Sequence, residues 1–368
     1  MKLKKLFIYI LSLLMVVSFV LPISISFADS TQDNVTIDAP VAILMDANTG
    51  KILYEKNAYE KMYPASTTKI MTAILALENR DLSHIAKVSY NAIFSVPVGY
   101  SNANLQLDEE LTMEQLLNVL LIPSANDAAN VIAEDIGGSV ESFASMMNTK
   151  ALEIGCKNTH FVNANGVHNE EHYSTAYDLA IMGQYAMKNE DFRRIVSTVR
   201  YTLPVTNKYE KADRIFLNTN NLINNKSNQY YEYCIGTKTG YTDAAKNCIV
   251  ATAKKDDFEL ICVIMGAANN ADSNKFKDCV SLFNFGFDNY TYKTLHTKDN
   301  VYKVINPRNA NSKTNSLNVL FANDVNVLMK KSDYDNEIIP TVDLDNRIKA
   351  PISKGSVIGK ISYDILRY

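Results

Sequence analysis

The order of apolar patterns along the chain constrains its fold more than any other feature. Runs rich in aliphatic and β-branched residues, typical of strands, occur at 40–45 and 51–54 and again at 248–253 and 258–266. Residues between about 66 and 187 instead repeat their apolar positions at helical spacing. Strands at both ends of a helical stretch predict one sheet with helices packed on it, an α+β domain.

Several helix boundaries can be predicted from capping residues. Thr112 and Gln115 form a capping box, and Pro123 ends the helix that follows them. Glycines end two of the later helices. The predicted helices cover about 66–77, 112–122, 127–136, 143–154, 177–187 and, after the second group of strands, 279–287.

A second domain is predicted after residue 287. Short β-type runs separated by Asn, Asp and Lys turns predict a small all-β domain over 288–368. The predicted strands cover 301–305, 317–321, 326–329, 338–342 and 357–361.

The first 28 residues are typical of a secretory signal peptide. Three lysines precede a stretch, residues 6–27, without any charge, and Ser26-Phe27-Ala28 offers small residues before Asp29. An uncleaved membrane anchor is the alternative, because the stretch is nearly long enough to span a bilayer. Cleavage would leave 368 − 28 = 340 residues in two domains, 29–287 and 288–368. We therefore expect an exported protein, in the cell envelope or secreted.

Charge and cysteine content exclude some classes of function. Without the leader, 34 basic residues stand against 40 acidic ones, and no basic run indicates a nucleic-acid partner. Five cysteines, none in a Cys-x-x-Cys pair, leave at least one thiol unpaired and leave open whether any disulfide forms. No cofactor or metal is expected.

Ser66 and Lys69 form the first motif that indicates chemistry. On a helix, residues three apart share a face, so the two side chains can touch. A serine hydroxyl needs a base to become a nucleophile, and Lys69 can be that base only if burial or a second cation makes it neutral. The pattern occurs once in the chain, but an N-capping serine beside an ordinary surface lysine would look the same.

Two further motifs follow in order. Ser124-Ala125-Asn126 lies in a loop between two predicted helices, where a helix cap is the simpler interpretation. Lys238-Thr239-Gly240 precedes a predicted strand and offers a cation and a hydroxyl for a carboxylate, with a glycine that lets a substrate approach the backbone. Each motif alone is weak, and the three in order are far more specific.

Together these motifs resemble those of penicillin-binding proteins and serine β-lactamases. The segments 64–73, 123–129, 172–178 and 236–242 are similar to the low-molecular-weight D-alanyl-D-alanine carboxypeptidases, and 350–355 is similar to the second domain of that family. The resemblance implies a penicillin-binding domain, an antiparallel sheet with packed helices, followed by the small all-β domain. It also implies a serine-type carboxypeptidase that takes the terminal D-Ala from peptidoglycan pentapeptides during cell wall biogenesis, with β-lactams as inhibitors.

The resemblance also implies a role for each site residue. Ser66 would attack the carbonyl between two D-alanines, Lys69 would take its proton, and Ser124 would pass a proton to the leaving amine. Asn126 would hold the substrate backbone, and Lys238 and Thr239 the terminal carboxylate. Gly240 gives the substrate room, and the backbone N–H groups of Ser66 and Tyr241 would form the oxyanion hole.

The sequence also offers features of three other functions. His168-Asn169-Glu170-Glu171-His172 matches a zinc-protease pattern, but that pattern needs a helix and here follows a turn-rich segment. A serine β-lactamase would need a glutamate-held water, which no segment indicates, and usually has Asp where Ala125 stands. A non-catalytic wall sensor would have lost its nucleophile or base, whereas Ser66 and Lys69 are both present.

Two departures from the family affect what can be expected. The family usually has Ala-Gly where this chain has Ala245-Lys246, outside the motifs. Family members commonly end in an amphipathic helix that lies on a membrane, and the residues before Tyr368 are strand-like instead. Association with a membrane surface therefore stays open.

Overall fold

The computed structural model describes residues 35–363 except 212, 269–273, 312–314, 337 and 346. The predicted signal peptide lies outside these residues. Among the helices within them, none combines the length and the apolar character needed to cross a membrane.

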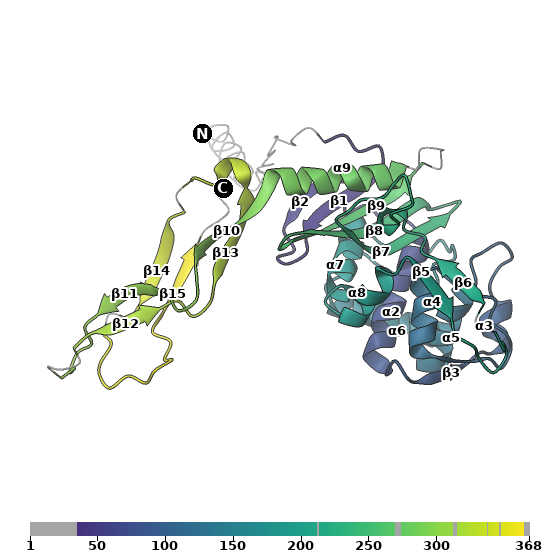
Figure 1. Cartoon of the computed structure of the whole chain (residues 1–368), viewed down its shortest axis with the longest axis horizontal. Helices are drawn as coiled ribbons and strands as arrows, with labels where there is room; N and C mark the ends of the chain where they lie inside the picture. Colours follow the sequence, from purple (N-terminus) through teal and green to yellow (C-terminus); the bar gives the residue numbers. More distant parts are fainter. Residues whose placement is uncertain are drawn as a thin grey trace, which may run out of the picture. The chain divides into compact units, whose positions relative to one another are not determined.

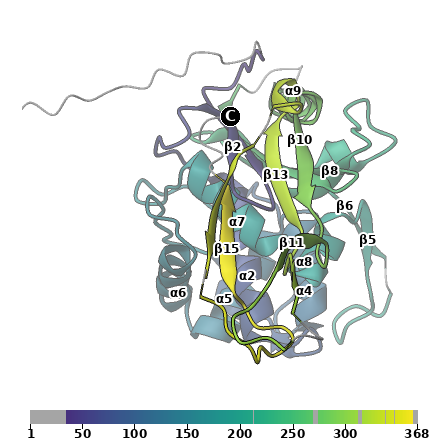
Figure 2. The ribbon, with the colours of Figure 1, turned by 90° about the vertical axis from the view of Figure 1, so that its left-hand side faces the viewer.

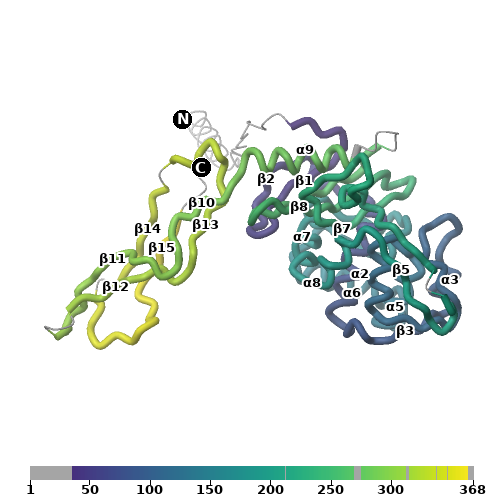
Figure 3. Tube along the Cα trace, in the orientation of Figure 1, coloured from purple at the N-terminus to yellow at the C-terminus, as the bar shows by residue number. Residues whose placement is uncertain are grey.

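The main sheet joins strands from both ends of the first domain, as predicted. Its order is β2-β1-β9-β8-β7, and every neighbouring pair is antiparallel. In Figure 3 the early strand β1, coloured purple, lies beside green strands from much later in the chain, and Figure 1 labels its partner among them, β9. The strands are β1 (Val41–Asp46), β2 (Ile52–Lys56), β7 (Cys234–Thr242), β8 (Lys246–Lys255) and β9 (Phe258–Ala267).

Both faces of this sheet are buried. Side chains alternate between faces along a strand, so Val41 and Ile43 of β1 enter one apolar cluster while Ala42 and Leu44 enter another. Helix α9 (Asn274–Asn289) covers the second cluster, and the remaining helices cover the first (Figures 1 and 2). This arrangement confirms the predicted α+β architecture.

The predicted helices are present, with boundaries shifted by a few residues. The Thr112 hydroxyl accepts from the Gln115 N–H at 3.2 Å, and the Gln115 side chain accepts from the Thr112 N–H at 2.7 Å, which confirms the capping box. The predicted helices before the second group of strands are α2 (Lys69–Asn79), α4 (Met113–Leu121), α5 (Asn126–Gly137), α6 (Val140–Glu153) and α7 (Ala176–Ala186). Two shorter helices, α3 (Tyr90–Phe94) and α8 (Glu190–Val196), were not predicted.

Two small hairpin-like sheets flank the helices and were not predicted. They pair β3 (Ile85–Lys87) with β4 (Glu110–Thr112) and β5 (Arg200–Leu203) with β6 (Arg214–Leu217). Arg214 of β6 forms an ion pair with Glu109, whose side chain is fully buried. This contact ties the β5–β6 sheet to the segment that precedes β4.

Within the described part of the chain after α9 there are three antiparallel strand pairs, which confirms the predicted all-β region. The predicted strand runs are shifted by two residues at most, while β10 was not predicted. The pairs are β10 (Tyr290–His296) with β13 (Val325–Lys330), β11 (Val301–Ile305) with β12 (Leu317–Leu320), and β14 (Pro340–Leu344) with β15 (Gly359–Tyr363).

Candidate active site

Ser66 lies in a single 3-10 turn, Ala65–Thr68, immediately before α2. The sequence predicts an α-helix from about this point, but the structure has a tighter turn here. In this turn the Thr67 hydroxyl donates to the carbonyl oxygen of Pro64 at 2.7 Å. Ala65 has a φ of +48°, a conformation that costs energy for a residue with a Cβ. Ser66 is half-buried, so the turn presents its hydroxyl at the start of a buried helix.

Lys69 is fully buried, and its amine has three partners. Nζ lies 2.9 Å from Ser66 Oγ, 2.8 Å from Asn126 Oδ1 and 2.6 Å from the carbonyl oxygen of Asn165. The last two oxygens can only accept hydrogen bonds. A neutral amine has two N–H donors and one lone pair, so it satisfies both acceptors and keeps its lone pair for the Ser66 hydroxyl. An ammonium could instead donate to all three oxygens, so the contacts position Lys69 beside the serine, and its protonation state depends on the electrostatics.

Electrostatics favour the neutral amine. Burial lowers the pKa of Lys69 well below its usual value, and the positive charge of Lys238 lowers it further, while Asp127 opposes the shift. Asp127 is itself held by backbone N–H groups, including that of Ala103 at 3.0 Å. The charge of Lys238 therefore helps to keep Lys69 neutral.

The Asn165 carbonyl comes from a turn that sequence reasoning recognised only as a turn. The Asn165 side chain donates to Asn130 of α5 at 3.0 Å, which anchors the turn. Gly166 has a φ of +84°, and a Cβ there would come within 1.9 Å of the carbonyl oxygen of Ala65. The turn therefore packs directly against the backbone that precedes the serine. Because any residue can supply a carbonyl oxygen, side-chain patterns gave no signal for this contact.

The second motif spans the start of α5, with Ala125 as its N-cap and Asn126 as its first residue. Asn126 donates to the Ser101 carbonyl at 2.8 Å and accepts from Lys69, so its amide holds the lysine in place. Ser124 is buried with a φ of +70°. Among the described residues, no hydrogen bond joins the Ser124 hydroxyl to Lys69 or Lys238.

The third motif lies on β7, an edge strand of the main sheet. A Cβ on Gly240 would come within 3.0 Å of the Ser66 backbone nitrogen, so this glycine lets β7 pack against the 3-10 turn. Lys238 is buried and donates to the Thr239 carbonyl at 2.8 Å. Tyr241 is exposed, and its hydroxyl donates to Asp243 at 2.9 Å.

The structure adds two residues that the motifs did not include. Lys275 of α9 donates to Asn247 at 2.9 Å; burial and the charge of Lys275 together lower the pKa of Lys238 to about 7. The Thr219 hydroxyl lies 2.6 Å from the Thr239 hydroxyl. Both contacts join segments distant in the sequence.

The two histidines of the zinc-protease pattern do not lie on a helix. His172 is buried, with Nδ1 accepting from the Val162 N–H at 3.2 Å and Nε2 2.8 Å from the Thr68 hydroxyl. Burial, with a smaller effect of nearby positive charge, lowers its pKa to about 3, so the ring is neutral and Nε2–H donates to Thr68. Its contacts make His172 a support for the turn that carries Ser66.

The assembled groups suit acyl transfer. A serine hydroxyl faces a buried amine that can be neutral, at the start of a helix, and a buried cation and a hydroxyl lie on the adjoining strand. Such a set can form an ester with a carbonyl carbon while the second cation attracts an anionic group on the same substrate.

Comparisons with known proteins point to the same chemistry. Residues 28–269 match the family described as D-alanyl-D-alanine carboxypeptidase, and residues 290–366 match the C-terminal domain of penicillin-binding protein 5. The D-alanyl-D-alanine carboxypeptidase DacF of Bacillus subtilis is 34% identical over 331 residues, which are 88% of this chain and 81% of that protein.

Solved structures share the fold. The Streptococcus pneumoniae protein PBP3, described as a peptidoglycan synthesis regulatory factor, aligns with a TM-score of 0.75 and 27% identity over 89% of this chain and 93% of its own. The DD-transpeptidase of Streptomyces K15 aligns with a TM-score of 0.63 and 34% identity over 69% of this chain and 98% of its own.

Proposed function

Since the chain belongs to the D-alanyl-D-alanine carboxypeptidase family, we propose that it cleaves the terminal D-Ala from peptidoglycan stem peptides through an acyl-enzyme on Ser66. The family makes it a serine-type carboxypeptidase, a hydrolase of low-molecular-weight penicillin-binding type with a role in the cell wall. The observation that carries the assignment to Ser66 is its 2.9 Å contact with Lys69, whose other partners are both acceptors.

In the acylation step, Lys69 takes the proton of Ser66 as Oγ bonds to the carbonyl carbon between the two D-alanines. The backbone N–H groups of Ser66 and Tyr241 stabilise the oxyanion. The C–N bond breaks, and the departing amine of D-Ala receives a proton through Ser124. Water then hydrolyses the ester and restores the Ser66 hydroxyl.

Substrate binding depends on β7 and the second motif. Lys238 and Thr239 hold the terminal carboxylate, Asn126 contacts the peptide backbone, and Gly240 leaves room for the substrate. The burial of Lys238 and the close packing of its strand against the Ser66 turn at Gly240 support this assignment. A β-lactam carries a carboxylate and a reactive amide in a similar arrangement, so it acylates Ser66 and leaves slowly.

We test this with penicillin and intact-protein mass spectrometry followed by peptide mapping. One adduct on the Ser66 peptide is expected for the wild type and for Ser145→Ala, a control at an exposed helix serine, and none for Ser66→Ala. Release of D-Ala from a soluble pentapeptide should show the same dependence. Rapid penicillin turnover without an adduct would indicate a β-lactamase, and neither adduct nor turnover would indicate a binding module.

Export is part of the proposal. The lysines and the uncharged stretch of the leader support cleavage after Ala28. Mass spectrometry of protein recovered outside the cytoplasm should give a chain that begins at Asp29. A chain that keeps residues 1–28 would support an anchor instead.

A further inference from the structure

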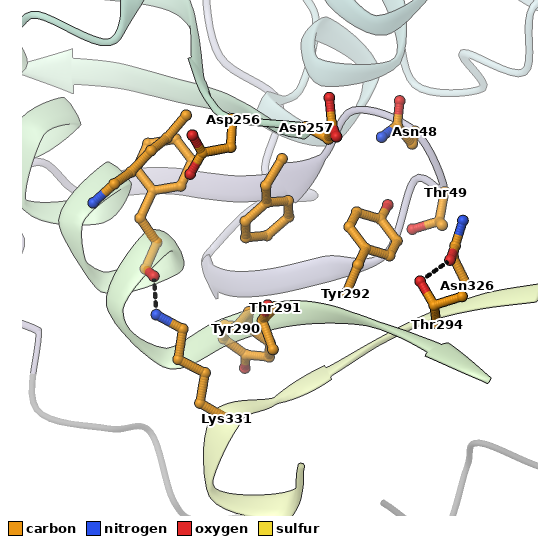
Figure 4. Close-up of a pocket in the computed structure, with 13 residues that line it drawn as sticks. Asn48, Thr49, Asp256, Asp257, Tyr290, Thr291, Tyr292, Thr294, Asn326 and Lys331 are labelled. Carbon is orange, nitrogen blue, oxygen red and sulfur yellow. Dashed lines mark hydrogen bonds between the residues drawn. The ribbon is translucent and has the colours of Figure 1, made fainter.

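A cavity of about 730 Å³ lies outside the candidate active site. One side is formed by the turn after β1, with Asn48, and the turn between β8 and β9, with Asp256 and Asp257. The other side is formed by β10, with Asn326 and Lys331 beyond it (Figure 4). Its volume is within the range of about 300–1,000 Å³ typical of small-molecule sites. None of the proposed catalytic or substrate-binding residues lines it.

The charges around the cavity balance. The lining includes two basic residues, Lys255 and Lys331, and two acidic residues, Asp256 and Asp257. Lys331 donates to the Phe287 carbonyl at 2.8 Å, and the Lys255 amine lies 5.0 Å from the centre of the Tyr233 ring, so both cations have partners within the protein. Neither a strongly anionic nor a strongly cationic ligand is favoured, which leaves a neutral polar ligand.

Aromatic rings give the cavity apolar surfaces. The half-buried rings of Phe258 and Tyr292 meet edge to face at 5.6 Å between centroids. The Tyr292 hydroxyl donates to Asp46, a fully buried carboxylate that also accepts from the Thr49 N–H, each at 2.8 Å. These contacts fix the Tyr292 ring before any ligand arrives, so little entropy is lost on binding.

Hydrogen-bonding groups surround the rings. The exposed carboxylates of Asp256 and Asp257 can only accept, whereas the Asn326 amide, whose oxygen accepts from Thr294 at 2.7 Å, keeps its N–H₂ group as a donor. Asn48 adds a second amide at the rim (Figure 4). A ligand that suits this set has hydroxyls that donate and accept, amide groups, and apolar faces that lie on rings. Those are the properties of an N-acetylated amino sugar.

We propose that this cavity binds the glycan strand of the wall polymer whose peptides reach Ser66, an inference that rests on the proposed function. Gly240, beside Ser66, pairs with Cys248, and β8 runs from there to Lys255 at the cavity, about 23 Å at the rise of a strand. A glycan held in the cavity and a peptide at Ser66 can therefore belong to one polymer. The cavity would favour polymeric substrate over free peptide.

The test uses the whole chain with Ser66→Ala, so that the serine cannot react, and tetra-N-acetylchitotetraose as a neutral amino-sugar probe. Binding is measured by calorimetry and by saturation-transfer NMR. The double variant Asp257→Ala/Asn326→Ala removes one acceptor and one donor from exposed positions, and Glu141→Ala, an exposed carboxylate on α6, is the control. We expect at least about tenfold weaker binding in the double variant, the value of one hydrogen bond from each residue, and no change in the control.

A kinetic comparison separates this inference from the proposed function. With Ser66 present, the double variant should hydrolyse a soluble pentapeptide at the wild-type rate and release D-Ala more slowly from glycan-linked polymer. No oligosaccharide binding by the wild-type cavity, or equal binding by the double variant, would overturn the glycan site. Failure of the wild type to hydrolyse the soluble peptide would instead contradict the proposed function.

Discussion

The ionisation of two buried lysines determines how the proposed reaction should depend on pH. Lys69 acts only when neutral, so kcat/KM should rise with pH as Lys69 loses its proton. Lys238 binds a carboxylate only when charged, and its pKa is about 7 before substrate binds. For a peptide with a free C-terminal carboxylate, kcat/KM should therefore fall as pH rises above about 7.

The control for this pH profile is the same peptide with its terminal carboxylate converted to an amide. Its kcat/KM is low at every pH, but the decline above neutrality should disappear because Lys238 has no anion to hold. An identical alkaline decline for both peptides would mean that Lys238 does not bind the carboxylate.

Thr219 should help Thr239 to bind substrate. Its hydroxyl lies 2.6 Å from that of Thr239 and orients it, and the residue is exposed, so its replacement should not affect folding. Thr219→Val should raise KM about fivefold, the value of one hydrogen bond near 1 kcal/mol, with kcat little changed. Thr219→Ser should behave as the wild type. Steady-state kinetics decide the matter, and a serine variant as poor as the valine variant would exclude a role for the hydroxyl.

At the scale of single residues, the candidate site could be predicted from the sequence only in part. Ser66 and Lys69 are three apart, so local geometry alone brings them together. Thr219, Lys275 and the carbonyl of Asn165 could not be predicted, because they reach the site through tertiary contacts, and one of them uses a backbone atom. The proximity of the three motifs was inferred from family resemblance rather than from spacing.

At the scale of elements, a substitution in the turn that ends at Gly166 should slow acylation, because this turn packs against the backbone before Ser66. A Cβ at Gly166 would collide with the Ala65 carbonyl at 1.9 Å, and the backbone would have to move the Asn165 carbonyl away from Lys69. Gly166→Ala should slow penicillin acylation about 100-fold, since displacements near 1 Å cost that much.

Gly155→Ala is the matched control for this variant. Gly155 also has a positive φ, +97°, but nothing lies within 4 Å of an added Cβ. It should lose only about 1 kcal/mol of stability to backbone strain, with acylation unchanged. Equal acylation rates for both variants, followed with a fluorescent penicillin, would show that the contact with Ala65 is unimportant.

Elements with a clear burial pattern were predictable, and those held by single side-chain contacts were not. β1 and β8 are buried on both faces, which imposes continuous apolar runs, and α4 has its capping box. By contrast, β3 and β6 are short, and β6 is anchored by the ion pair of Arg214 with Glu109, about a hundred residues earlier in the chain. No local pattern reveals such a partner.

For the whole molecule, cysteine labelling should report global unfolding. All five thiols are free and buried, and burial raises the pKa of Cys248 to about 11 and that of Cys234 to about 12. The thiolate is the reactive form, so the native protein should resist maleimide at neutral pH. In urea, mass spectrometry should find five adducts.

The number of maleimide adducts also shows whether any two of the five cysteines form a disulfide, which the cysteine count alone does not determine. The sulfurs of Cys262 and Cys279 lie 3.6 Å apart without a bond. Only three adducts in urea without reductant would mean that the exported protein has joined this pair, contrary to the free thiols of the structure. A native adduct on any cysteine would contradict its burial.

The separation of the site's parts along the chain has a practical consequence. The Ser66 hydroxyl comes from the 3-10 turn before α2 and the Lys69 amine from the first residue of α2. The Asn165 carbonyl comes from a turn before α7, and Lys238 and Lys275 come from β7 and α9. A folding intermediate with only one layer in place therefore does not contain the full set. A β-lactam that labels Ser66 covalently would therefore count only the correctly folded molecules. The ratio of labelled to total protein in a sample of cell envelope would measure how well the cell matures this protein, without any need to purify it.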